Sequence, residues 1–304
     1  MKLQIISNLN YPIGNVINIE LQNSLETKIA VAFMKYTGLK VIEKSLLQCL
    51  ENKGKVEIIA GLDFKTTDPQ SMYYLIDLQK NFKNLSFFCF GDKDENKTNI
   101  VFHPKIYLFS KKKEKTSIIG STNLTGGGLT SNFEVNTIIK EQKPLYYSQL
   151  EAVYNSIKFT DTIFIPDEEY LLGYSEVFKT FLNNENKARK DKGVKKLIKD
   201  IKRKEEELPG TVPTMKQLTI EAIKYLTKES EYAKLKEIGD YVEKRIKEEN
   251  IKFNMQHFRE NLRKGIYFDL IGFGGKYNKE LFETKGKYTG LFTLTPKGKR
   301  YEGR

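Results

Sequence analysis

The chain has 304 residues, a length that suits two modest domains better than one compact domain. Its net charge of +12 favours an acidic partner, and nucleic acid is a better candidate than an anionic membrane. The plainer explanation is that the charge only keeps the protein in solution. Its two cysteines, Cys49 and Cys89, lie in apolar runs, so we expect no disulfides. We find neither a secretory signal nor an apolar run of about 20 residues. We therefore expect a cytoplasmic protein without membrane spans.

The first half of the chain alternates between strand-like and helix-like patterns. Apolar runs rich in β-branched or aromatic residues predict strands at 27–33, 56–62, 85–90, 101–109, 116–123 and 133–140. Helical spacing of apolar residues predicts helices at 38–50, 68–82 and 144–158. Asp68 is a good N-cap for the second helix, with Pro69 in its first position, and Pro144 opens the third. This alternation favours an α/β fold, a sheet with helices on its faces.

Composition changes near residue 183, where a nearly all-polar stretch begins that the sequence LPGTVP then ends. We predict a solvated helix or linker here, and a phosphate-contacting arm is the alternative. Helices are predicted after it at 214–228, 234–249 and 254–265, the last ended by Gly265, and strands at 267–273 and 287–302. Three helices followed by a hairpin resemble an α+β winged-helix domain. The predicted divisions are therefore 1–165, a charged helical connector at 166–212, and 213–304.

The predicted hairpin of 101–123 brings chemically active side chains together. Residues two apart on a strand share a face, so His103 and Lys105 point the same way, as do Ser121 and Asn123. An imidazole, an ammonium, a hydroxyl and an amide in one patch supply what phosphoryl transfer needs, a nucleophile and donors for charged oxygens. Pro104 cannot donate a ladder hydrogen bond, so its strand lies at an edge, a bulge or a strand start.

Each of these residues also has a plainer interpretation. His103 could be a hydrogen-bonded strand histidine, and Lys105 an ordinary edge-strand lysine. Asn123 could be a turn residue before three glycines, and Glu134 a surface carboxylate. Their joint occurrence in register favours a catalytic patch over four separate coincidences.

The order His103-Pro-Lys105 and then Gly120-Ser121-Thr-Asn123 resembles the H-x-K…G-S-x-N motif of the phospholipase D superfamily. Glu134 matches the acidic residue that follows this motif in the nuclease branch, where it implies a carboxylate that accepts a hydrogen bond from the histidine ring. The resemblance covers residues 25–160 and implies a mixed sheet with helices on both faces. Ser110 departs from the family, which often has Asp there, and the turn inside the motif is longer than usual.

The resemblance implies a mechanism with two histidines, one forming a phosphohistidine and the other protonating the leaving oxygen. This chain has one H-x-K, and His257 is followed by Phe-Arg, so we expect a homodimer that joins both His103 residues through the nuclease domains. No carboxylate cluster of the two-metal kind is present, since Asp92, Asp94 and Glu95 read as a polar loop. We therefore expect no metal or other cofactor, and we interpret the glycines 126–128 as a flexible turn rather than a phosphate-binding loop.

Basic and amide side chains in the last third of the chain are candidates for DNA contact. In the helix predicted at 254–264 these are Asn254, Gln256, His257, Arg259, Asn261, Arg263 and Lys264. Around the predicted wing they are Lys285, Lys287, Lys297, Lys299 and Arg300. The plainer alternative is an amphipathic helix with a hydrated face.

These features together predict an enzyme that acts on double-stranded DNA. The combination resembles phospholipase-D-type restriction endonucleases, which implies a site-specific cut and a cognate methyltransferase as a further partner. Three alternatives remain: a less specific repair or defence nuclease acting with a helicase, a catalytically dead DNA-binding regulator, and a phospholipase. The absence of a membrane anchor and of a second H-x-K disfavours the phospholipase.

Overall fold

The computed structural model describes residues 1–91, 100–207, 212–251, 253–273, 277–286 and 289–301. The chain divides into two compact units, Met1–Lys187 and Ala188–Arg304. Within the described residues, no helix combines the length and the apolar character that crossing a bilayer requires. Cys49 and Cys89 are both buried free thiols, and burial raises the pKa of Cys49 to about 11.

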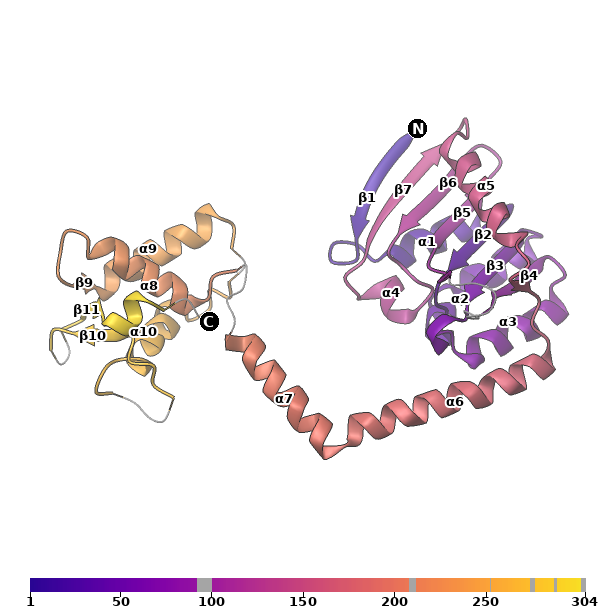
Figure 1. The fold of residues 1–304 in the computed structure, drawn as a ribbon. Helices are drawn as coiled ribbons and strands as arrows, with labels where there is room; N and C mark the ends of the chain where they lie inside the picture. The colour runs from indigo at the N-terminus through magenta and orange to yellow at the C-terminus, as the bar shows by residue number, and fades with distance from the viewer. Residues whose placement is uncertain (92–99, 208–211, 252, 274–276, 287–288, 302–304) are drawn as a thin grey trace. The chain divides into compact units, whose positions relative to one another are not determined.

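The described strands of the first unit form one mixed sheet (Figure 1). They are β1 (Lys2–Ser7), β2 (Glu26–Val31), β3 (Lys55–Gly61), β4 (Leu85–Phe90), β5 (Lys105–Ser110), β6 (Lys115–Gly120), β7 (Val135–Glu141) and β8 (Ile163–Phe164). The sheet order is β1-β7-β6-β5-β2-β3-β4-β8. Strand β3 runs parallel to β2 and β4, whereas the remaining neighbours are antiparallel.

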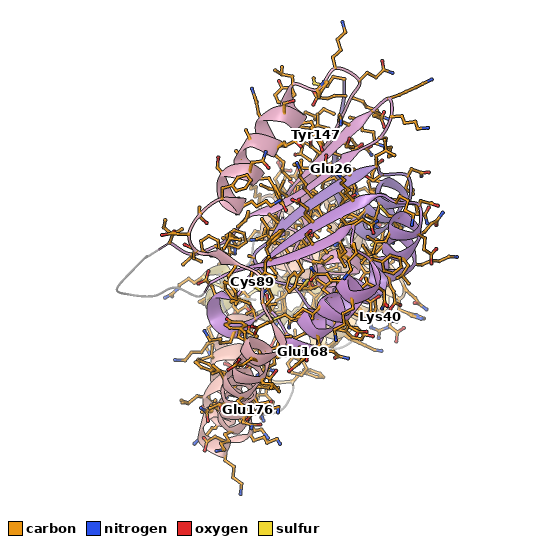
Figure 2. All side chains as sticks on the ribbon, turned by 90° about the vertical axis from the view of Figure 1, so that its right-hand side faces the viewer. Glu26, Lys40, Cys89, Tyr147, Glu168 and Glu176 are labelled. Carbon is orange, nitrogen blue, oxygen red and sulfur yellow. The ribbon has the colours of Figure 1, made fainter. Side chains whose placement is uncertain are left out.

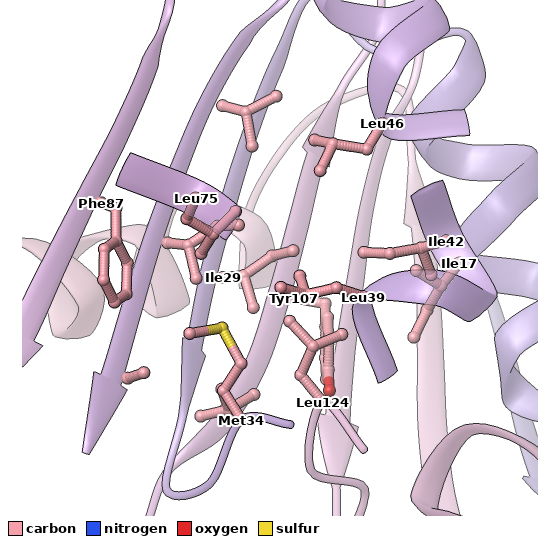
Figure 3. Close-up of a cluster of buried hydrophobic side chains, with 14 of the residues drawn as sticks. Ile17, Ile29, Met34, Leu39, Ile42, Leu46, Leu75, Phe87, Tyr107 and Leu124 are labelled. Carbon is pink, nitrogen blue, oxygen red and sulfur yellow. The ribbon is translucent and has the colours of Figure 1, made fainter. Parts of the chain in front are cut away.

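Helices cover both faces of this sheet, which confirms the predicted α/β class. They are α1 (Ile13–Gln22), α2 (Tyr36–Glu51), α3 (Pro69–Asn81), α4 (Gly126–Thr130), α5 (Tyr146–Lys158) and α6 (Glu168–Lys190), with a short 3-10 helix η1 (Asp63–Lys65). One face packs against α1 to α4 through a core that includes Ile17, Leu46, Leu75 and Tyr107 (Figure 3). The other face packs against α5 through Tyr147, and Figure 2 shows this side chain on the side of the sheet opposite α2.

Two helix starts show how local chemistry sets these elements. Asp68 caps α3 by accepting a hydrogen bond from the Ser71 amide at 2.7 Å, and Pro69 occupies the first helical position, as predicted. The carboxylate of Glu141 accepts backbone N–H bonds from residues 145–147 at 2.9 to 3.3 Å. It therefore supports the start of α5, which begins at Tyr146 rather than at Pro144.

The three glycines 126–128 are not the flexible turn that the sequence predicted. They form the first turn of α4, where the Thr125 hydroxyl accepts a hydrogen bond from the Gly128 amide at 3.1 Å. A Cβ atom on Gly128 would lie 2.7 Å from the carbonyl oxygen of Asn123. Glycine is thus required here by close packing against the preceding loop.

Glu20 is a buried carboxylate in α1, with its side chain 0 % exposed. It contacts Lys111 and Lys140 at 2.5 Å each and accepts a hydrogen bond from Thr116 at 2.9 Å. Burial alone would raise the pKa of Glu20, but the hydrogen bonds from Lys111, Lys140 and Thr116 outweigh it, so the pKa is lowered. The ionised carboxylate therefore ties α1 to the ends of β5, β6 and β7.

Replacing Glu20 with Gln is expected to destabilise the first unit by about 2 kcal/mol at neutral pH, because two lysines lose their counter-charge but remain partly hydrated. Since the folded pKa is lowered, this contribution is fully present above the ordinary glutamate pKa and is lost as pH falls from there through the lowered folded pKa. Urea unfolding followed by circular dichroism at several pH values measures the effect. Glu51→Gln, at an exposed position at the end of α2, is the control; equal midpoints for wild type and Glu20→Gln would contradict the assignment.

The described part of the second unit combines helices with a small antiparallel sheet. Its elements are α7 (Lys192–Glu207), α8 (Met215–Leu226), β9 (Ala233–Lys234), α9 (Leu235–Glu248), α10 (Phe258–Phe268), β10 (Phe282–Thr284), β11 (Leu291–Leu294) and α11 (Pro296–Lys299). The sheet order is β10-β11-β9, and its core includes Leu218, Val242, Leu262 and Phe292. Near the start of helix α6, Leu171 and Tyr174 are buried in the core of the first unit, although the sequence analysis assigned them to the connector.

Some local predictions in the second unit are wrong. Helix α10 continues through Gly265 to Phe268, so the strand predicted at 267–273 is not formed. The buried Asp269 follows the helix, pairing with Lys216 at 2.5 Å and accepting a hydrogen bond from the Lys279 amide at 2.9 Å, which favours a turn there. The predicted wing strand after residue 294 is instead α11, capped by Thr295. The LPGTVP segment lies partly outside the described residues.

Candidate active site

Four strand ends meet at one edge of the large sheet. Strand β5 is antiparallel to both β6 and β2, and β6 is antiparallel to β7, so β5 and β7 begin where β6 and β2 end. Each predicted catalytic residue of the first unit lies at or just beyond one of these ends: His103, Lys105, Ser121, Asn123 and Glu134. The topology thus brings together residues that are up to 31 positions apart in the sequence.

His103 does not lie on the strand, contrary to the prediction of a strand over 101–109. Strand β5 begins at Lys105, directly after Pro104, which has no N–H for the ladder. Strand β2 nevertheless holds this segment, because the Ala32 amide donates to the Pro104 carbonyl at 2.9 Å. The predicted alternation of faces is confirmed, since Phe102 and Ile106 pack into one core and Tyr107 into the other.

The His103 ring is exposed, and Lys105 lies beneath it with only 8 % of its surface accessible. The Lys105 Nζ atom lies 2.7 Å from His103 Nδ1 and 3.1 Å from Nε2, and it donates to the His103 carbonyl at 3.0 Å. Phe33 contacts both groups, with its ring centroid 5.9 Å from that of His103 and 6.0 Å from Nζ. Burial lowers the pKa of Lys105, and the negative charge of Glu134 partly opposes this shift.

Ser121 and Glu134 form a hydrogen-bonded pair across the ends of β6 and β7. The Ser121 hydroxyl donates to the Glu134 carboxylate and accepts from the Val135 amide at 3.1 Å. The sequence had predicted a hydrogen bond from the His103 ring to Glu134. In the described residues the ring instead has Lys105 as its polar neighbour, and Glu134 acts on that lysine through its charge.

Asn123 is fixed by the end of β2. Its Oδ1 atom accepts a hydrogen bond from the Phe33 amide at 3.1 Å, which leaves Nδ2 as the donor that can face a ligand. The preceding residue is also held, because Tyr107 donates to the Thr122 carbonyl at 3.0 Å and Asn136 donates to the Thr122 hydroxyl at 2.8 Å. Sequence reasoning missed Phe33 and Asn136, and a single sequence gives no signal that would mark them.

Ser110, the departure from the family motif, lies at the opposite end of β5 from Lys105. A strand rises about 3.3 Å per residue, so five steps separate the two positions by roughly 16 Å. The Ser110 hydroxyl accepts a hydrogen bond from Lys115, another residue remote from His103. This departure therefore does not alter the groups around the imidazole.

No three His, Cys, Asp or Glu side chains in the described parts of the chain are arranged to hold a metal ion. The predicted polar loop with Asp92, Asp94 and Glu95 lies outside those parts. Lys105 and Asn123 remain as hydrogen-bond donors for a charged oxygen beside His103.

The predicted DNA-contacting residues fall into two structural groups. Exposed Asn254, Gln256 and His257 precede α10 instead of lying on it, and His257 has a left-handed backbone with φ of 55°. On α10 itself, Asn261 and Arg263 are exposed, whereas Arg259 pairs with Asp240 at 2.7 Å and Glu243 at 3.0 Å, and Lys264 pairs with Glu260 at 2.6 Å.

The residues predicted around the wing are also divided. Lys297 pairs with Glu280, whereas Lys299 is exposed on α11 and Arg300 follows that helix. Lys285 lies over the Tyr232 ring at 5.7 Å, and Lys287 is outside the described residues.

Comparison with known proteins gives matches to part of the chain. Solved structures that are similar include NucT from Helicobacter pylori, with 17 % identity over 54 % of this chain and 99 % of that chain and a TM-score of 0.42. The phospholipase D family member Nuc from Salmonella typhimurium shows 13 % identity over 55 % and 99 %, with a TM-score of 0.40. The phosphatidylserine synthase of Haemophilus influenzae Rd KW20 shows 15 % over 60 % and 46 %, with a TM-score of 0.43.

Among curated proteins, the comparison found no match. A family model described as "Cardiolipin synthase, PLD-like domain" matches residues 19–157, which include the motif from His103 to Asn123 and Glu134. The mixed sheet with helices on both faces agrees with this match. Residues 19–157 therefore form a PLD-like domain.

Proposed function

We propose that this protein is a metal-independent endonuclease that hydrolyses phosphodiester bonds of double-stranded DNA as a homodimer. The observation that carries the proposal is the meeting of His103, Lys105 and Asn123 at four strand ends, with an exposed imidazole above a buried ammonium. A nucleophile beside fixed donors is the arrangement that phosphoryl transfer requires.

In this mechanism the DNA phosphate first takes the hydrogen bond that Lys105 makes to the His103 ring. The freed ring nitrogen attacks phosphorus, a nitrogen–phosphorus bond forms, and the bond to the leaving oxygen breaks. Lys105 Nζ and Asn123 Nδ2 donate to the non-bridging oxygens as their charge develops. Glu134 favours the charged form of Lys105 despite its burial.

The leaving oxygen needs a proton, which a second imidazole supplies before it activates water to hydrolyse the phosphohistidine. Each chain offers one His103, and His257 belongs to the other compact unit. We therefore assign the proton donor to the His103 imidazole of a second copy of the chain, which a two-fold axis relates to the first. The hollow next to His103 is lined in part by exposed Val101 and Val153, an apolar surface that a second copy can cover.

Double-stranded DNA is the proposed substrate because of the second unit. Its order of helix, strand, two helices and two strands, α8-β9-α9-α10-β10-β11, resembles that of a winged-helix domain, and we assign the base-reading position to α10. We assign Asn254, Gln256, Arg263, Lys264 and Lys299 to DNA contact. A site-specific cut in a restriction system, with a cognate methyltransferase as partner, is the corresponding biological role.

One observation favours a less specific nuclease as the second candidate. Arg259, the central arginine of the predicted base-reading helix, is engaged by Asp240 and Glu243 of its own unit. An arginine held in this way is less available for bidentate contact with a guanine. Non-specific phosphate contacts by lysines would then dominate binding, which would fall steeply with salt.

Incubating the purified chain with several plasmids in excess EDTA tests the proposal. Cleavage without added metal is expected, and sequencing of the ends should give 5′-phosphates. Discrete fragments would support the site-specific enzyme, and a smear the less specific nuclease. Strict dependence on added magnesium, or no cleavage under any condition, would contradict the proposed chemistry.

A further inference from the structure

Asp63 is a buried carboxylate that the proposed mechanism does not use. It lies in η1, directly beyond the end of β3, and is 2 % exposed. Its Oδ2 atom accepts a hydrogen bond from the Phe102 amide at 2.8 Å. The bond joins the end of β3 to the residue before His103, although β2 separates β3 from β5 in the sheet.

The segment around His103 is held on both sides of that residue. Before it, the Phe102 ring stacks on Phe90 with centroids 4.5 Å apart and fits over Gly61, where a Cβ atom would lie 2.7 Å from the Phe102 ring. After it, the Pro104 carbonyl accepts from the Ala32 amide at 2.9 Å. The imidazole between these points is exposed, so a substrate can reach it.

These contacts lead us to infer that Asp63 is a positioning residue, which sets the place of His103 by holding the Phe102 amide. The inference rests on the proposed function. A carboxylate makes a stronger hydrogen bond to an amide than a neutral acceptor does, and burial strengthens it further. A nucleophile that moves by about 1 Å from its attack position loses on the order of 100-fold in rate.

The same loop contains a matched control. Asp68 lies five residues further along and also accepts backbone hydrogen bonds, from Ser71 at 2.7 Å and from Tyr36 at 3.0 Å. It holds the starts of α3 and α2 rather than the segment of His103. Loss of either carboxylate should cost comparable stability, since both cap buried or partly buried amides.

The test compares Asp63→Ala, Asp63→Asn and Asp68→Ala in the full chain. Asp63→Ala is expected to lower kcat for DNA cleavage by about 10- to 100-fold with little change in KM. Asp63→Asn keeps an acceptor oxygen and should retain kcat within about threefold, and Asp68→Ala should leave kcat unchanged. Asp63→Ser, whose hydroxyl is too short to reach Phe102, replaces Asp63→Ala if that variant does not fold.

A second readout does not depend on activity. The chain has two histidines, so its imidazole signals in NMR spectra can be assigned to His103 and His257. The His103 signal should shift in Asp63→Ala and stay in place in Asp68→Ala, while His257 is unaffected by both. Unchanged kcat and an unmoved His103 signal in Asp63→Ala would overturn the inference. A wild type that cleaves nothing, with the His103 shift still present, would instead reject the nuclease function alone.

Discussion

Replacing His103 with alanine is expected to lower kcat for DNA cleavage by at least about 10⁴-fold and to leave DNA affinity nearly unchanged. The imidazole is the nucleophile in the proposed reaction, and Lys105 cannot replace it because burial keeps its amine below the ring. Single-turnover cleavage and a separate binding assay measure the two quantities. His257→Ala is the control: it lies in the other compact unit and has no role in the proposed reaction, so it should retain kcat, and any loss should appear in DNA affinity alone.

The same variant tests whether two copies share one site. After subunits exchange in an equal mixture of wild type and His103→Ala, about a quarter of the dimers carry two intact histidines. Activity per wild-type chain should therefore fall to about half of its unmixed value. An unchanged activity per wild-type chain would show that each copy works alone and would remove the dimer from the mechanism.

Much of the first unit could be predicted because its elements carry their own signals. The strands β2, β3 and β4 are short apolar runs. Because helices cover both faces of the sheet, its central strands are buried on both sides, and a continuous apolar run predicts such a strand. Helix α3 is marked by Asp68 and Pro69, whose effects are local. These local preferences predict the final structure because the tertiary contacts favour the same elements.

Elements defined by distant partners could not be predicted. Strand β1 has mostly exposed side chains and is fixed by pairing with β7, where Lys2 lies opposite Lys140. Helix α1 follows Pro12 without a side-chain cap, so its start carries a weak signal. The aromatic residues Tyr267 and Phe268 favoured a strand on intrinsic preference, but packing of α10 on its neighbours kept them helical.

The candidate site shows the same division. The motif identified His103, Lys105, Ser121, Asn123 and Glu134, and the strand topology places all five at one edge of the sheet. The sequence could not reveal that Ser121 bonds Glu134, or that Phe33 fixes Asn123 through a backbone amide. These partners depend on where β2 and β7 end, which is a tertiary property.

Replacing Lys105 with methionine is expected to lower kcat by about 10²- to 10³-fold, the loss typical of one donor to a developing oxyanion. Only the protonated amine brings a positive charge to the developing oxyanion, and burial lowers the pKa of Lys105. Wild-type kcat/KM should therefore decline with rising pH before an ordinary lysine would lose its proton. Lys105→Arg should show a low activity without this decline, because guanidinium stays charged. An alkaline limb unchanged in Lys105→Arg would assign the titration to another group.

The same pKa shift makes Lys105 a burden on stability at neutral pH. The unfolded chain holds the proton more tightly than the folded one, so stability rises with pH through the window between the two pKa values. The urea midpoint of wild type should therefore rise relative to that of Lys105→Met as pH increases through this window. Urea unfolding at several pH values measures the difference. If the difference between the two unfolding midpoints stays constant with pH, the folded and unfolded chains bind the Lys105 proton equally. The buried ammonium would then not explain why this position needs a lysine.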